Sequence, residues 1–132
     1  MPPRYFTVDE ARALVPWLIS TFGEVAPMRE KAKQLGAETM GLVEGMRHNG
    51  GSDSDEQLDL KRRALKEASD FVADRLESIN ERGILVKGMD PGLVDFPSMW
   101  EGREVYLSWL EGEEELGFWH EVEAGFPGRQ AL

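Results

Sequence analysis

The stretch "ERGILVKGMDPGLVDF", residues 81–96, decides the fold, because the hydrophobic period of the chain changes within it. Before Gly83, apolar residues recur at three- and four-residue steps, which is the period of an amphipathic α-helix. After Gly83, short apolar runs alternate with turn residues, a pattern typical of β-strands. We therefore predict one domain, in which residues 1–83 form a helical hairpin and residues 84–132 form an antiparallel sheet and a C-terminal loop.

The helix before Gly83 shows the clearest periodicity. Its apolar positions at seven-residue spacing are Leu58, Leu65, Val72 and Ile79. Asp53 or Ser54 is expected to cap its start after the loop "HNGGSDSD", residues 48–55. Gly83 is expected to end it in the left-handed conformation that favours glycine.

The N-terminal segment "TVDE" predicts a capping box, in which Thr7 and Glu10 bind each other's backbone amides. Pro16 lacks an amide donor and crowds the preceding turn, so we expect a short helix at 8–14 and a second helix beginning near Pro16. Pro27 should kink that second helix.

The second helix carries its own apolar stripe, at Leu18, Phe22, Val25, Met28, Ala32, Leu35, Leu42 and Met46. Two helical segments of about 30 residues, joined by a short loop, predict an antiparallel hairpin about 45 Å long.

The sequence after Gly83 predicts four strands. "GILVKG" (83–88) is followed by the turn "DPG" (90–92), in which the glycine should take a positive φ, and by "LVDF" (93–96), which Pro97 should end. "REVYLSWL" (103–110) and "LGFWHEV" (116–122) both alternate, with Val105, Leu107 and Trp109 on one face. One face of this sheet must be covered, and the hairpin is the available cover. The expected fold is α+β: a long antiparallel helical hairpin with a short N-terminal helix, packed on a small C-terminal antiparallel β-sheet.

Composition excludes several kinds of site. The 132 residues include no cysteine, which removes disulfides, thiolate zinc sites and cysteine nucleophiles. The net charge is −10, and residues 84–132 hold three basic against ten acidic side chains, which argues against nucleic-acid binding despite "KRR" at Lys61–Arg63. No apolar run reaches the roughly 18 residues that span a bilayer. The start has no signal-peptide pattern. We expect a cytoplasmic protein without a membrane partner.

Four segments resemble a bacterial family catalogued as domain of unknown function 2203: "YFTVDEARALVP" (5–16), "GILVKGMDPGLVDFP" (83–97), "GREVYLSW" (102–109) and "FWHEVEAGFPGR" (118–129). The resemblance covers nearly the whole chain. It marks positions without assigning them a chemical role. The marked residues are Asp90, Gly92, Asp95, Pro97, Gly102, Arg103, Trp109, Trp119, His120, Gly125, Gly128 and Arg129.

His120 admits three interpretations. A structural histidine would pack on Phe118 or Trp109 and bind a carboxylate or a carbonyl. An acid–base or ligand-binding histidine would face a pocket. A metal site would need carboxylates from neighbouring strands on the same face, such as Glu104 or Asp95. Its chain neighbour Glu121 points to the opposite face of the sheet, and no dense ligand motif is present.

The other candidate residues have structural alternatives too. Arg103 and Arg129 could each bind an anion, but pairing with an acidic residue, which would tie the C-terminal loop to the sheet, is the simpler expectation. Asp90 is most simply a turn residue. Asp95 lies in an apolar strand and needs a partner, for which Arg103 or Arg129 is expected. Trp119 could stack a planar ligand or belong to the core, and Trp100 is the expected exposed interface residue.

Two functions follow from these patterns. The first is a non-catalytic protein-interaction module that dimerises through its hairpin, without cofactor or metal, and with room for an unknown protein partner. The second is a small-molecule or metal-binding site, possibly hydrolytic, around His120. Its candidate ligand-binding residues are Asp95, Arg103, Glu104, Trp119, His120 and Arg129.

Overall fold

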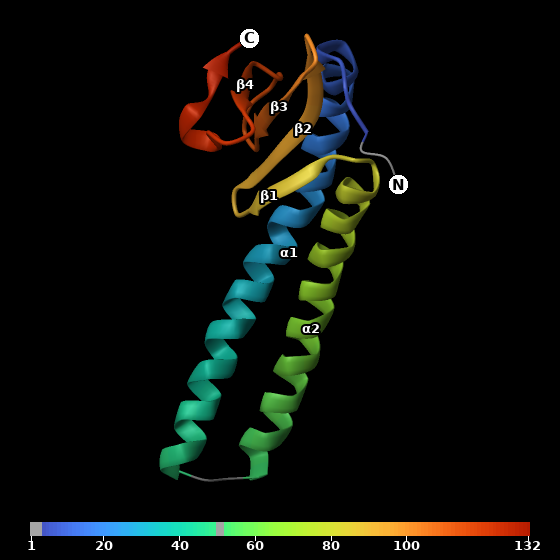
Figure 1. Cartoon of the computed structure of the whole chain (residues 1–132). Helices are drawn as coiled ribbons and strands as arrows, with labels where there is room; N and C mark the ends of the chain where they lie inside the picture. Colours follow the sequence, from blue (N-terminus) through green and yellow to red (C-terminus); the bar gives the residue numbers. More distant parts are fainter. Residues whose placement is uncertain (1–3, 50–51) are drawn as a thin grey trace. The chain divides into compact units, whose positions relative to one another are not determined.

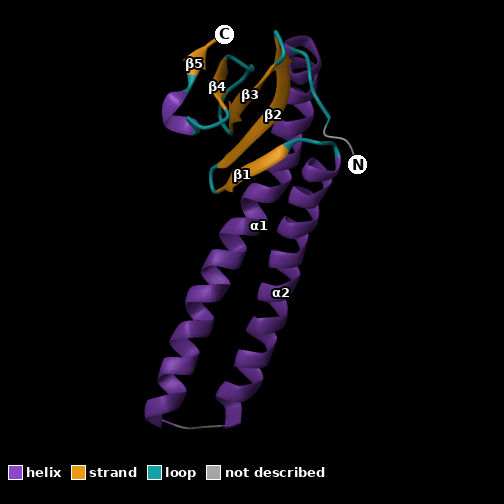
Figure 2. Cartoon of the chain, in the orientation of Figure 1, coloured by secondary structure: helices purple, strands orange, loops and turns teal. Residues whose placement is uncertain are grey.

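The computed structural model of the chain describes residues 4–49 and 52–132 and confirms the α+β class (Figures 1 and 2). Two long helices, α1 (Val8–Asn49) and α2 (Ser52–Glu81), precede five strands. The chain divides into two compact units. We call residues 4–23 with 75–132 the sheet unit, and residues 24–74 the hairpin unit.

Helix α1 begins with the predicted capping box. The Thr7 amide donates to Glu10 Oε1 at 3.0 Å, and the Glu10 amide donates to Thr7 Oγ1 at 3.1 Å. The predicted break at Pro16 is wrong, because α1 is one continuous helix of 42 residues and no separate short helix precedes it. A proline inside a helix costs about 3 kcal/mol. Burying each large apolar side chain of this segment contributes about 1.5–3 kcal/mol, so tertiary packing outweighs the local rule.

The hairpin unit contains residues 24–49 of α1 and the part of α2 up to Asp74. The two segments run antiparallel, and an ion pair between Lys61 Nζ and Glu38 Oε2 joins them at 2.7 Å. The side chains of Asp53 and Ser54 lie outside the described residues, so the predicted cap at the start of α2 stays a prediction. Neither α1 nor α2 has a stretch apolar enough to cross a lipid bilayer.

In the sheet unit, α2 ends at Glu81 and the chain turns at Gly83, as predicted. Gly83 has a φ of 88° and donates its amide to the Asn80 carbonyl at 2.9 Å. Five antiparallel strands follow in the order of the sequence: β1 (Leu85–Met89), β2 (Gly92–Trp100), β3 (Arg103–Leu110), β4 (Phe118–Glu121) and β5 (Gln130–Ala131). A 3₁₀ turn at Phe126–Gly128 leads into β5, which the sequence did not predict.

Two predictions about the first turn and second strand are wrong. Pro97 does not end β2, because β2 continues to Trp100. The amide and carbonyl of one residue point the same way in an antiparallel strand. The Pro97 carbonyl accepts a hydrogen bond from the Phe6 amide at 2.8 Å, so this carbonyl points away from β3. The register of β1 with β2 ends at Asp95, before Pro97. The amide hydrogen that proline lacks would therefore not have bonded to β3. Gly92 has no positive φ, and the Asp90–Pro91 peptide is cis. Glycine is required at position 92 because a Cβ there would overlap the Phe22 ring.

One face of the sheet packs against the first turns of α1. The Phe22 and Trp109 rings lie 5.8 Å apart, and the Phe6 ring meets the Phe96 ring edge-on at 5.2 Å. The side chains of Val94, Phe96, Val105, Leu107 and Trp109 are all fully buried on this face. The predicted alternation in β3 and the predicted helical cover are therefore confirmed. The opposite face of the sheet points away from α1.

Candidate functional site

The polar residues of the candidate site lie on the sheet face that points away from α1. Successive residues of a strand point to opposite faces. Because Val94 and Phe96 face the helix, Asp95 between them faces the other way. The register places Asp95 beside Ser108 and Tyr106 beside His120. Three strands, β2, β3 and β4, therefore bring these four side chains onto one face.

His120 and Asp95 form a buried hydrogen-bonded pair. Their exposed fractions are 2% and 4%, and His120 Nε2 lies 3.0 Å from Asp95 Oδ1. His120 Nδ1 lies 2.7 Å from the backbone carbonyl oxygen of Glu121. A carbonyl can only accept a hydrogen bond, so Nδ1 must carry a proton. Nε2 and Oδ1 then share a single proton, held on one atom or the other, and the pair has no net charge in either case.

The surroundings favour the protonated forms of Asp95 and Tyr106. Burial raises the pKa of Asp95, because desolvation disfavours the carboxylate, while the His120 bond and the charges of Lys87 and Arg129 act in the opposite direction. Burial also raises the pKa of Tyr106, and the negative charges of Glu104 and Asp95 add to that rise. The Tyr106 hydroxyl is therefore protonated at neutral pH and can donate a hydrogen bond.

A cavity of about 190 Å³ lies beside the pair. Lys87 reaches it from β1, where the register shifts between Val86 and Gly88, and such a bulge redirects a side chain. The Lys87 ammonium lies 5.7 Å from the centre of the Tyr106 ring, which itself meets the His120 ring edge-on at 5.6 Å. The cavity combines polar groups with an apolar wall. Its lining residues are Lys87, Leu93, Asp95, Tyr106, His120, Val122, Gly125 and Phe126.

Arg129 ties the C-terminal segment to the sheet, as the sequence predicted. Its guanidinium donates to Ser108 Oγ at 3.0 Å and to Glu113 Oε1 at 2.7 Å. It also stacks on two aromatic rings, 4.1 Å from the centre of Phe118 and 4.9 Å from that of Phe126. These contacts hold the 3₁₀ turn, and with it Phe126, at the edge of the cavity.

The expected partner of Asp95 was an arginine, and that prediction is wrong. Arg129 binds Glu113, and Arg103 binds Glu121 Oε1 at 2.9 Å, so His120 is the partner that satisfies Asp95. His120 binds a carboxylate and a carbonyl, as its structural interpretation predicted, whereas packing on Phe118 stays a prediction and packing on Trp109 is wrong. The register places Tyr106 directly beside His120, and Trp109 faces α1.

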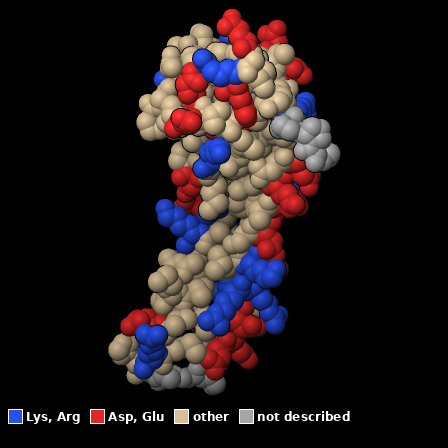
Figure 3. Space-filling view, in the orientation of Figure 1, with Lys and Arg blue, Asp and Glu red and all other residues tan. Residues whose placement is uncertain are grey.

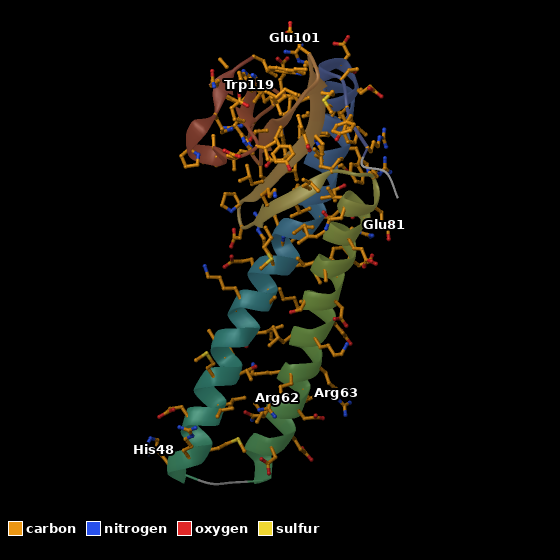
Figure 4. All side chains as sticks on the ribbon, in the orientation of Figure 1. His48, Arg62, Arg63, Glu81, Glu101 and Trp119 are labelled. Atoms are coloured by element: carbon orange, nitrogen blue, oxygen red, sulfur yellow. The ribbon has the colours of Figure 1, made fainter. Side chains whose placement is uncertain are left out.

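The remaining predicted residues lie apart from the cavity. The Trp119 ring, labelled in Figure 4, lies at a tilt against the Trp100 ring, with ring centres 4.8 Å apart. Trp100 is half-buried rather than an exposed interface residue. Glu104 and Arg103 do not line the cavity. Of the six predicted ligand-binding residues, the structure brings Asp95 and His120 together. Arg129 lies outside the cavity and packs on Phe126, which lines it.

The sequence prediction omitted Lys87, Tyr106 and Phe126. The alternation of β3 could have found Tyr106, because it shares a face with Ser108. Lys87 could not be found this way, since the bulge in β1 interrupts the alternation. Glu113 could not be singled out as the partner of Arg129, because it is one of four glutamates in the run "EGEEE".

The chemistry available to the site follows from its hydrogen bonds. Both ring nitrogens of His120 are engaged, so the imidazole can act as a free base only if one of these bonds breaks. Within residues 4–49 and 52–132, no three His, Asp or Glu side chains lie close enough together to hold a metal ion. The arrangement is suited to binding a small molecule by charge and hydrogen bonds.

The fold and site define an α+β protein with a five-stranded sheet, a long helical hairpin and a cavity of mixed polar and apolar lining on the sheet face that points away from α1. The family described as "Uncharacterized conserved protein (DUF2203)" matches residues 4–132, so the chain belongs to this family and the resemblance is confirmed. No curated protein and no solved structure matches the chain.

Proposed function

We propose that this protein is a non-catalytic interaction module that forms a homodimer through its hairpin unit. The observation that carries the proposal is the incomplete burial of the α1 stripe. Of the stripe residues in the hairpin unit only Val25 is buried, and the others are half-buried: Met28, Ala32, Leu35, Leu42 and Met46.

The same helix is buried far better in the sheet unit. There Ala11, Val15, Leu18 and Phe22 are at most 2% exposed. Two antiparallel helices can cover only the narrow seam between them, so a wide apolar stripe stays partly open to solvent. A second hairpin would cover it and complete a four-helix core.

The two most exposed of the large hydrophobic residues in the described chain belong to the hairpin unit. Met40 is 75% exposed on α1 and Leu60 is 65% exposed on α2. Both side chains point away from the seam between the helices, because each lies two residues from a position that faces it, Leu42 on α1 and Leu58 on α2. On the face shown in Figure 3, uncharged atoms cover much of α1 in this unit, while charged residues are frequent along α2.

The size of the hairpin fits a stable dimer. The α1 segment from Glu24 to Asn49 is about 39 Å long at 1.5 Å per residue. Two helices side by side present a face about 20 Å wide, which gives roughly 800 Å² per copy. A specific interface of standard size buries about this area on each partner. A second copy of the chain is thus the occupant we favour over an unrelated protein.

Sedimentation velocity of the full chain, measured over a range of concentrations, tests the proposal. We expect a dimer of twice 14.9 kDa, and we expect Leu42→Glu, which places a charge within the stripe, to shift it towards monomer. Ile19→Glu is the control, because it places the same charge on an apolar residue of the same helix that belongs to the sheet unit. A monomer at all concentrations would overturn the proposal, as would equal weakening by both variants.

A further inference from the structure

We infer that the cavity beside Asp95 and His120 is a binding site for a small monocarboxylate with an apolar body. This inference does not rest on dimerisation, because every residue that carries it belongs to the sheet unit.

The charge of the cavity selects an anion. The Asp95–His120 pair carries no net charge, because Nδ1 carries the proton that it donates to the Glu121 carbonyl, and one further proton is shared between Nε2 and Oδ1. Lys87 is the remaining charged residue of the lining, so the cavity has a net charge of about +1. The charge of Arg129 also reaches Asp95, but its ion pair with Glu113 offsets that charge, so Lys87 is the charge that decides the sign. A positive cavity is the exception in a chain whose net charge is −10.

The donors of the cavity suit a carboxylate. Lys87 and Tyr106 both line it, and the Lys87 ammonium lies over the Tyr106 ring, 5.7 Å from its centre. An ammonium and a phenol can each donate to one oxygen of a carboxylate, and charge-assisted bonds of this kind are the stronger ones. When its proton lies on the carboxyl oxygen, Asp95 donates to His120 and does not repel the anion.

The rest of the lining is mostly apolar and partly open. Leu93, Val122 and Phe126 contribute it, and Val122 and Phe126 are both more than 40% exposed. A carboxylate held by Lys87 and Tyr106 would place its hydrocarbon part against these three side chains. Binding would then remove exposed apolar surface from water, which is favourable.

The volume limits the size of the ligand. A cavity of about 190 Å³ equals the volume of roughly six water molecules. It is smaller than the pockets of drug-sized ligands, which begin at about 300 Å³. An acid of roughly six to nine non-hydrogen atoms fits this space.

A purely structural role accounts poorly for the pair. A well-packed apolar pair is often as stable as a buried polar one, so stability alone does not call for Asp95 and His120 on this face. A buried titratable pair that lines a cavity is the pattern expected of a functional site.

The test is a titration of the ¹⁵N-labelled full chain, followed by amide chemical shifts. The probes are isovalerate, the neutral isovaleramide and the cationic isoamylamine, which share one hydrocarbon body. We expect saturable shifts with isovalerate at Leu93, Val122 and Gly125. Each of the other two probes should bind at least about tenfold more weakly, since each lacks a charge-assisted bond.

Three variants locate the charge that is responsible. Lys87→Gln should weaken isovalerate binding about tenfold, and Lys87→Arg should retain most of it. Lys66→Gln is the matched control, because it removes the same charge from an exposed site in the hairpin unit and should leave the affinity unchanged. The inference is overturned if isovalerate gives no saturable shifts, if the amide or the amine binds as well as the acid, or if Lys87→Gln and Lys66→Gln have equal effects.

Discussion

Replacing Asp95 and His120 one at a time, and then together, should reveal strong energetic coupling between them. His120→Phe removes the partner of a buried carboxyl group, and breaking a buried pair of this kind costs about 3–5 kcal/mol. Asp95→Leu leaves His120 Nε2 without a partner, and an unsatisfied buried nitrogen costs about 1–3 kcal/mol.

The double variant should lose much less than the sum of the two single variants. It removes both polar groups and leaves an apolar pair of similar volume, which is often close to neutral in stability. The Glu121 carbonyl, which loses the Nδ1 donor, keeps its hydrogen bond from the Ala124 amide at 3.0 Å. We therefore expect a coupling energy of about 2 kcal/mol or more, near the upper end for neighbouring residues.

Urea unfolding followed by tryptophan fluorescence measures these free energies. The protein concentration must be the same for all four proteins, because any dimer makes the apparent stability concentration-dependent. If the two single losses simply add in the double variant, the hydrogen bond between Asp95 and His120 contributes nothing and our account of the site is refuted.

Three further predictions concern the sheet unit. Because burial raises the folded-state pKa of Asp95 above its ordinary value of 3.8, the stability that this group contributes is full below that pH and is lost as the pH rises through the folded pKa. The difference in unfolding free energy between wild type and Asp95→Asn, measured by urea unfolding across pH, should decrease as the pH rises. An increase with pH would contradict this prediction. Gly92→Ala should destabilise the chain by about 1–3 kcal/mol, because its Cβ overlaps the Phe22 ring, whereas Gly117→Ala, with open space around it, should change stability by less than about 0.5 kcal/mol in the same assay. Arg129→Lys should lower the thermal midpoint through a loss of about 1–2 kcal/mol, because lysine cannot bind Ser108 and Glu113 together, and Arg103→Lys at an exposed ion pair should have little effect. Equal midpoints for the two lysine variants would refute this.

Helices and strands were predictable where the periodicity was long. The change of period at Gly83, the capping box at Thr7 and the alternation of β3 all follow from local rules, and the structure bears them out. The two failures at proline have one cause. At Pro16 and Pro97 the local rule considers only the amide hydrogen that proline lacks. The free-energy cost also depends on which acceptor that amide would have bound and on how much apolar surface the helix or strand buries.

The site was predictable only in part, because it depends on strand register. The sequence identified His120 and Asp95 as interesting, yet 25 positions separate them, and no local pattern aligns β2 with β4. Arg129 was easier, because an arginine among acidic residues must pair with one of them. The bulge that places Lys87 at the cavity has no sequence signature, and β5 is too short for a periodic signal.

The central claim is that the half-buried stripe of α1 binds the same stripe of a second copy. An isotope-filtered NOE experiment on a mixture of labelled and unlabelled chains detects contacts between copies and no others. We expect intermolecular NOEs from the methyl groups of Leu35, Leu42 and Met46. Their absence at a concentration where the chain is dimeric, or intermolecular NOEs confined to sheet-unit methyls such as those of Val122 and Met99, would contradict the claim.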